Sequence, residues 1–235
     1  MNLKLLLPAA AAMLFGSFAL ASASPFLDTS LTDPPGVYFG SGNVNDHFTV
    51  DRTGSIETGL SAIHRFIGPV TPVGSTYFVP TGPTSVPGKT GSEWGFVFSL
   101  NLNYNGTNPG ASLSDVTTRL TLNDVGLGTT GFFDPLLIPD NAISGPGFQN
   151  SESLSFAAIA AALGDPGYNV NANDTYVFTF DVLNRAGAVL SSNQITVVAG
   201  NGAIAVPEPM TLSLFAAGLF GVGAFRRRRK AIKQS

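Results

Sequence analysis

One stretch of the chain, residues 94–104, reads Trp-Gly-Phe-Val-Phe-Ser-Leu-Asn-Leu-Asn-Tyr. Large apolar side chains occupy every second position, and small or amide side chains fill most of the positions between them. Successive side chains of a β-strand point to opposite faces, so this alternation predicts a strand with one buried and one solvated face. Strands of that kind assemble into antiparallel sheets. We expect Trp94 and Tyr104 to lie in the core beside the phenylalanines.

Turn-forming residues divide the rest of the chain into short segments. The turn residues at 184–187 predict a hairpin that joins residues 174–183 to residues 188–198. Only residues 155–163, with their run of alanines, have the composition of a short helix. The alternation recurs at residues 56–66, 116–122 and 176–182, and segments rich in Pro, Gly, Ser and Thr predict loops at residues 26–38, 68–89 and 126–150.

Residues 24–205 are enough for one domain with a substantial core. Many short strands, frequent turns and a single short helix predict an all-β fold. We expect an antiparallel β-sandwich, of which a jelly-roll is one arrangement. The predicted loop at residues 126–150 is long for a compact domain, so it is either functional or contains an unrecognised strand.

The N-terminus has the composition of a secretory signal peptide. Lys4 precedes an apolar stretch, residues 5–20, and small residues follow it. Ala21 and Ala23 fit the small-x-small pattern that signal peptidase cleaves, so we expect a signal peptide at residues 1–23. Cleavage after Ala21 and an uncleaved N-terminal anchor are the alternatives. The chain has no cysteine, so the mature protein needs no disulfide.

The C-terminal thirty residues contain three successive features. Residues 206–209 read Val-Pro-Glu-Pro, residues 210–225 are uncharged and apolar, and five cations follow directly. A helix over residues 210–225 is about 24 Å long, slightly short of a hydrocarbon core of about 30 Å, and snorkelling cations compensate for the difference. A soluble core helix is the alternative, which the cations disfavour. The positive-inside rule predicts a transmembrane helix with the domain outside and residues 226–235 as a cytoplasmic tail, held in place by Arg226, Arg227, Arg228 and Arg229.

This order of motif, apolar span and arginine cluster resembles the PEP-CTERM sorting signal of Gram-negative bacteria. In that family an exosortase in the membrane recognises the tail. The resemblance implies that Pro207, Glu208 and Pro209 form the recognition and cleavage motif, and two prolines favour the extended conformation that suits a protease cleft. It further implies processing by exosortase and signal peptidase, with a transient anchor in the inner membrane and the domain in the periplasm.

The same resemblance implies a final location at the cell surface or outside the cell, among exopolysaccharide or biofilm. Residues 43–50 and 94–99 are also similar to strands of other exported proteins with this tail, which implies no particular activity. Residues 24–205 contain fourteen acidic and five basic residues, a net charge of −9. Such a domain is repelled by phosphate backbones, so we expect no binding of nucleic acid.

The sequence offers little for catalysis. Without cysteine, a nucleophile would need His47 or His64 as its base, and no G-x-S-x-G motif is present. We interpret Glu57, Glu93 and Glu152 as solvated surface carboxylates and not as a glycosidase pair. We therefore expect a non-enzymatic protein without a cofactor, and a secreted hydrolase is the least favoured alternative.

Calcium is a further hypothesis, because loops that contain Asp and Asn supply the oxygen ligands that this ion prefers. Neither candidate group matches the D-x-[DN]-x-[DN]-G loop, and such residues also form ordinary turns. The candidates are Asn43, Asn45 and Asp46 in one group and Asp134, Asp140 and Asn141 in the other.

The alternative to a structural or interaction role is a carbohydrate-binding module, with or without dependence on calcium. Such modules stack exposed aromatic rings on sugars. Tyr38, Tyr77 and Tyr168 lie in segments rich in glycine and proline, so we expect them to be free to face a ligand.

Overall fold

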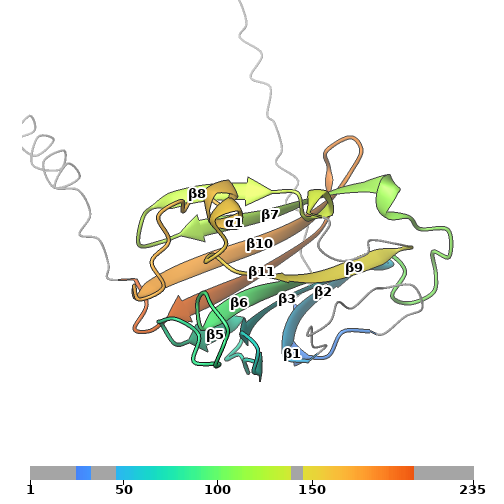
Figure 1. The fold of residues 1–235 in the computed structure, drawn as a ribbon. Helices are drawn as coiled ribbons and strands as arrows, with labels where there is room; N and C mark the ends of the chain where they lie inside the picture. The colour runs from blue at the N-terminus through green and yellow to red at the C-terminus, as the bar shows by residue number, and fades with distance from the viewer. Residues whose placement is uncertain (1–24, 33–45, 139–144, 204–235) are drawn as a thin grey trace, which may run out of the picture.

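The computed structural model describes residues 25–32, 46–138 and 145–203. Within them the chain forms two sheets and very little helix (Figure 1). One sheet has the order β1 (Phe26–Thr29), β2 (Phe48–Thr53), β3 (Ile56–His64), β6 (Trp94–Asn101) and β9 (Gly147–Glu152), with β4 (Gly68–Pro69) beside β3. The other has the order β5 (Thr76–Val79), β11 (Val189–Ala199), β10 (Asp174–Asn184), β7 (Val116–Asp124) and β8 (Thr129–Phe133). The helical elements are η1 (Leu113–Asp115), η2 (Pro135–Leu137) and α1 (Ala157–Ala162).

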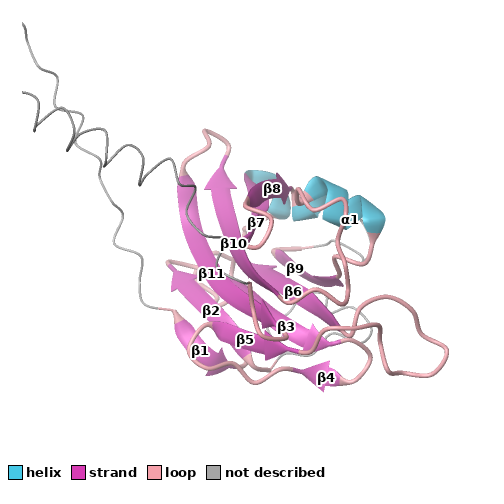
Figure 2. Cartoon of the chain, turned by 90° about the vertical axis from the view of Figure 1, so that its left-hand side faces the viewer, coloured by secondary structure: helices cyan, strands magenta, loops and turns pink. Residues whose placement is uncertain are grey.

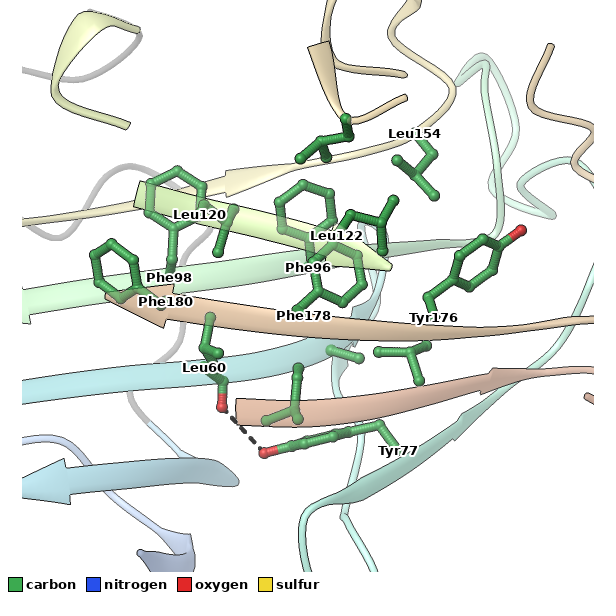
Figure 3. Close-up of a cluster of buried hydrophobic side chains, with 14 of the residues drawn as sticks. Leu60, Tyr77, Phe96, Phe98, Leu120, Leu122, Leu154, Tyr176, Phe178 and Phe180 are labelled. Atoms are coloured by element: carbon green, nitrogen blue, oxygen red, sulfur yellow. Dashed lines mark hydrogen bonds between the residues drawn. The ribbon is translucent and has the colours of Figure 1, made fainter. Parts of the chain in front are cut away.

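The two sheets pack face to face over one hydrophobic core (Figure 3). Phe96 of β6 and Phe178 of β10 meet across it with ring centroids 4.6 Å apart. Trp94 is 2% exposed and stacks near Tyr176, with 5.3 Å between the ring centroids. Each of these rings removes a large apolar area from water, which is the dominant favourable contribution to folding. The predicted all-β fold with paired sheets is therefore confirmed, as is the core position of Trp94.

The predicted hairpin and the predicted short helix are both present. β10 and β11 pair antiparallel from Asp174 opposite Ala199 to Leu183 opposite Val189. The turn between them has Gly187 at a φ of 81°, a left-handed conformation that glycine adopts without strain. The helix α1 lies within the predicted segment and packs beside β8 in both views (Figures 1 and 2).

The prediction of a solvated face on residues 94–104 was wrong. Every residue of β6 is buried, so both of its faces are covered. On its outer face, Val97 packs with Leu31, Phe48 and Val50 in a second apolar cluster. The alternation in the sequence could not show this, because the segment that covers the second face lies far away in the chain. Tyr104 lies beyond the end of the strand and is half-buried.

A buried glutamate fixes that covering segment to the sheet. Glu57 is 2% exposed and accepts hydrogen bonds from the Thr32 amide (3.0 Å) and hydroxyl (2.8 Å). Arg52 neutralises it through a contact of 2.7 Å between Nε and Oε2. The prediction of a solvated carboxylate was wrong for Glu57, and also for Glu152, which is 4% exposed.

Each of the three predicted loops contains a strand. β1 lies in the first, β5 in the second, and β8 with the start of β9 in the third. These strands are short or carry glycine and threonine, so their composition resembled that of loops. Pairing with longer neighbours stabilises them, as when β5 runs parallel to residues 196–199 of β11.

The strand order differs from a jelly-roll, in which most sequential strands alternate between the sheets. Here β2–β3, β7–β8 and β10–β11 each remain in one sheet as hairpins. Tight turns cause this, because they return the chain to the neighbouring position of the same sheet. The described residues contain no helix that is both long and apolar enough to cross a membrane. The predicted signal peptide (residues 1–23, with Ala21 and Ala23), transmembrane segment and basic tail lie outside the described residues.

Candidate functional site

Three buried aspartates gather at one end of the second sheet. Asp124 is the last residue of β7, Asp174 is the first residue of the neighbouring β10, and Asp165 follows α1. Their exposed fractions are 1%, 7% and 2% respectively. We call this group the aspartate cluster. Buried carboxylates are rare in proteins unless a cation, a proton or several hydrogen bonds compensate them.

The end of α1 is shaped so that it delivers Asp165 to the cluster. Gly164 has a φ of 80° and ends the helix in the left-handed conformation. The Asp165 amide then donates to the Ala160 carbonyl oxygen at 2.8 Å, which holds the turn. Gly131 of β8 lies directly against this turn, since a Cβ on it would come within 2.3 Å of the Leu163 carbonyl carbon. Two glycines thus allow the loop after α1 to reach the ends of the strands.

A third glycine admits the carboxylate of Asp174. The Gly126 amide donates to Asp174 Oδ1 at 2.9 Å, and a Cβ on Gly126 would lie 2.3 Å from Oδ2. The Thr175 amide donates to the same Oδ1 at 2.6 Å. On Asp124, Oδ1 accepts from the Leu127 amide at 2.8 Å. The β7–β8 turn therefore wraps its backbone around two of the three carboxylates.

Several oxygens of the cluster accept no hydrogen bond from an N–H group or hydroxyl in the described structure, although the Asp124 carboxyl lies within hydrogen-bonding reach of the carboxyls of Asp165 and Asp174. They are Oδ2 of Asp124, Oδ1 of Asp165 and the hydroxyl of Thr129, all shielded from solvent. Thr129 belongs to the site because it is the residue directly opposite Asp124 in the β7–β8 pair. An unpaired buried oxygen costs about 1–3 kcal/mol, and more if it is charged.

The cluster brings carboxyl groups of like charge close together. Burial, together with the charges of Asp124 and Asp174, raises the pKa of Asp165 to about 6. Burial is also the main reason that the pKa of Asp124 is raised, with the charge of Asp174 adding to it. The ion pairs of the described residues join other carboxylates, those of Asp28, Asp46, Glu57 and Asp181. No basic side chain within the described ranges therefore pairs with the cluster.

The side chains of the aspartate cluster are not arranged around a single metal position. Among the described residues, no three side chains of His, Cys, Asp or Glu are already arranged as the ligands of one metal ion. The arrangement is a close acidic group with unpaired oxygens, and it can be neutralised either by protons or by a cation that draws the carboxylates together.

The structure corrects the expected role of Tyr77. This residue lies in β5, is fully buried, and its hydroxyl donates to the carbonyl oxygens of His47 (2.9 Å) and Leu60 (3.2 Å), the latter drawn in Figure 3. It joins the two sheets and is not available to a sugar. Tyr168 is half-buried and packs edge-on against Trp94, with 6.4 Å between the ring centroids. Tyr38 lies outside the described residues.

The predicted calcium residues are not brought together by the described structure. Asp46 is exposed, where it accepts from the Ser30 hydroxyl at 3.0 Å. Asp134 instead caps η2, since its Oδ1 accepts from the Leu136 amide at 3.0 Å and also from the Thr118 hydroxyl. A structural role accounts for it. Asn43, Asn45, Asp140 and Asn141 lie outside the described residues.

A polar cavity of about 380 Å³ opens at the edge of β11. The described residues that line it are Pro25, Asp51, Ser75, Thr179, Ser192, Asn193 and Gln194. None of these is aromatic, so the cavity lacks the ring on which a sugar would stack.

Comparison with known proteins identifies the C-terminal region. Residues 205–229 match the family model described as the PEP-CTERM protein-sorting motif. The chain is thus an exported protein with a C-terminal sorting signal. That signal is the PEP-CTERM motif, which an exosortase processes and which directs proteins to the cell surface. The resemblance to this sorting signal that the sequence indicated is therefore confirmed.

The β-sandwich itself was compared with known sequences and structures. No curated protein sequence matches the chain. A solved structure with some similarity is the PmoD soluble domain from Methylocystis sp. ATCC 49242 (Rockwell), at 10% identity, covering 64% of this chain and 96% of that chain, with a TM-score of 0.28. A score this low supports no argument about fold or function.

Sequence reasoning missed the aspartate cluster. The sequence pattern treats the three residues separately: Asp124 follows the alternating segment 116–122, Asp165 follows the predicted helix 155–163, and Asp174 begins the predicted hairpin strand 174–183. Each reading was local, whereas the cluster depends on the pairing of β7 with β10 and on the contact of Gly131 with the end of α1. The available signal was weak: three aspartates beside glycine or at strand ends in a chain with few charges.

Proposed function

We propose that this protein is a non-enzymatic surface or extracellular-matrix protein, whose β-sandwich is delivered through its PEP-CTERM tail and has a structural or binding role among exopolysaccharide. The observation that carries the proposal is the match of residues 205–229 to the sorting motif. Cleavage at Pro207, Glu208 and Pro209 and removal of residues 1–23 by signal peptidase are parts of the same proposal.

The layout of the chain supports processing of the tail after folding. The last strand, β11, ends at Ala199, and a turn follows it in which the Gly202 amide donates to the Ala199 carbonyl oxygen at 3.0 Å. The sorting match begins at residue 205, after the end of the last described strand. We therefore expect removal of the tail to leave the described core and its sheet pairings in place.

A non-enzymatic role is supported by how the described ionisable groups are used. Arg52 pairs with Glu57 beneath the N-terminal segment, and Arg119 pairs with Asp181 across two neighbouring strands. His47 contacts Asp28 at 2.5 Å and has a φ of 61°, at the start of β2. Each of these contacts serves the fold, and none pairs a base with a nucleophile.

The sorting half of the proposal is tested by intact-mass spectrometry of the protein from a host with and without its exosortase. We expect the competent host to release a product that lacks the residues C-terminal to the motif. Glu208→Ala should leave the tail attached, whereas Lys233→Ala, outside the matched residues, should be processed normally. A full-length tail on the wild-type protein in the competent host would contradict the proposal.

A further inference from the structure

We propose that the α-amino group created by removal of residues 1–23 binds in the polar cavity at the edge of β11 and pairs there with Asp51. The processed chain begins at Ser24, and its ammonium group donates to the Asp51 carboxylate and to the side-chain oxygen of Asn193. This inference rests on the proposed removal of residues 1–23 by signal peptidase. It gives that cleavage a second consequence, because it creates the partner of a buried carboxylate.

The first observation is a buried carboxylate that has no cation beside it. Asp51 of β2 is 2% exposed, and its Oδ2 accepts hydrogen bonds from the hydroxyls of Ser191 (2.6 Å) and Thr53 (3.1 Å). Its Oδ1 is shielded from solvent and has no hydrogen-bond partner, and no ion pair of the described residues includes Asp51. A buried carboxylate of this kind is costly unless a cation or a proton compensates it.

The second observation is an unpaired oxygen from the other sheet. Asn193 of β11 is 2% exposed, and its Nδ2 donates to the carbonyl oxygens of Thr49 (2.8 Å) and Thr58 (3.0 Å), which fixes the orientation of the amide. Its Oδ1 is shielded from solvent and has no partner. Asn193 and Asp51 both line the cavity of about 380 Å³. The group that this wall lacks is a positively charged one with several donors, and an ammonium group has three.

The position of Pro25 identifies that group. β1 pairs antiparallel with β2 so that Phe26 lies opposite Val50, and one residue further along Pro25 comes beside Asp51. Pro25 and Asp51 both line the cavity. Two atoms separate the α-nitrogen of Ser24 from the ring nitrogen of Pro25, so the two nitrogens lie within about 4 Å of each other. Cleavage at the proposed site therefore brings an ammonium group within reach of the cavity.

The neighbouring residues favour this ammonium group over another cation. Arg52 is next to Asp51 in the chain, but it points to the opposite face of β2 and is held by Glu57 at 2.7 Å. Proline restricts the residue before it to extended conformations, so less conformational entropy is lost when the amino group is placed. An α-amino group has an ordinary pKa of about 7.7–8.0 and is therefore mostly charged at pH 7.

Calorimetry at pH 7 tests the pairing on two proteins purified in the same detergent. One consists of residues 24–235, released from a fusion by a protease that leaves Ser24 as the first residue. The other consists of residues 22–235, the product of the alternative cleavage, in which the ammonium group lies about 7 Å further along the chain. We expect the Tm of the first protein to exceed that of the second by about 2–4 °C.

Asp51→Asn should abolish this difference in Tm, because the ammonium group then has no carboxylate to pair with. Asp46→Asn is the matched control, since it removes a charge from an exposed aspartate and should keep the difference. Equal Tm values for the two wild-type proteins, or a difference that persists in Asp51→Asn, would overturn the pairing.

A second measurement does not depend on how well the Asp51 variant folds. The pKa of the Ser24 amino group, followed by its labelling with acetic anhydride at increasing pH, should lie above about 8 in residues 24–235 and in the ordinary range in urea. An ordinary pKa in the folded protein would contradict the pairing. The cleavage itself is checked by the intact mass of the secreted protein, and a first residue other than Ser24 would overturn the proposed cleavage site and with it the role of the pairing in the cell.

Discussion

Gly131 illustrates how a single residue decides whether the aspartate cluster forms. Its backbone lies so close to the turn after α1 that any Cβ would meet backbone atoms of Leu163 and Gly164 at 2.3–2.6 Å. Backbone atoms cannot move aside as the end of a flexible side chain can. The requirement for glycine therefore comes from contact and not from backbone conformation.

We expect Gly131→Ala to reduce the free energy of unfolding by about 1–3 kcal/mol, because the extra methyl group forces β8 and the α1 turn apart. Urea denaturation measures this change. Gly110→Ala is the matched control, since nothing lies within 4 Å of a Cβ at that position, and its effect should be small. Equal effects of the two variants would mean that the close contact does not determine stability.

The pKa of Asp165 gives a second prediction at the scale of one residue. Its value of about 6 in the folded protein lies above its ordinary value of 3.8, so the folded state holds the proton more tightly than the unfolded chain does. The resulting stability is fully present below about pH 4 and is lost as pH rises through 6. The titratable groups that interact with Asp165 are Asp124, Asp174, Tyr168 and Tyr176.

In calcium-free buffer, the Tm of Asp165→Asn relative to wild type should therefore increase as pH rises from 4 to 8. Comparison of the two proteins at each pH cancels the contribution of titrating groups that do not interact with Asp165. A difference in Tm that stays constant over this range would contradict the raised pKa.

At the scale of elements, β5 shows how a four-residue strand becomes part of the core. It pairs with β11 in one sheet, while the Tyr77 hydroxyl contacts β2 and β3 of the other: it lies 3.2 Å from the Thr49 hydroxyl and bonds the Leu60 carbonyl oxygen. The Tyr77 side chain thus links the two sheets, as does the Asn193 amide of β11, which donates to the carbonyl oxygens of Thr49 and Thr58.

Tyr77→Phe should lower the free energy of unfolding by about 1–2 kcal/mol, because it leaves buried carbonyl oxygens without their donor. Tyr104→Phe is the control, since that half-buried ring keeps its contact with Arg52, 5.4 Å from the ring centroid, and should change stability little. Guanidinium denaturation of both variants makes the comparison. If Tyr77→Phe were neutral, the hydroxyl would not contribute to joining the sheets.

At the scale of the whole molecule, the described sandwich ends in the sequence before the sorting match begins. The described core is made by strands between residues 26 and 199, whereas the sorting match spans residues 205–229. A fragment of residues 24–205 should accordingly unfold with a Tm within about 2 °C of that of residues 24–235 in the same detergent. A large drop, measured by calorimetry, would mean that the tail contributes to the fold.

The sequence by itself determined the features that depend on neighbouring residues. Alternation predicted the core strands, turn residues predicted the β10–β11 hairpin, and the order of Pro-Glu-Pro, apolar run and arginines predicted the sorting motif. In each case the physical signal, a period, a turn or a contiguous motif, lies within a few residues. The short strands β1, β5, β8 and β9 were not predicted, because pairing with a long neighbouring strand stabilises them, whereas their own composition does not.

Only the tertiary structure decided which polar residues meet. It placed Tyr77 in the core, covered the second face of β6, and brought together three aspartates that are 41 and 9 residues apart in sequence. Such contacts depend on which strands pair and how closely backbones approach, and no local pattern records either one. The local sequence therefore indicates where the chain is sent, whereas the pairing of its strands brings the three buried aspartates together.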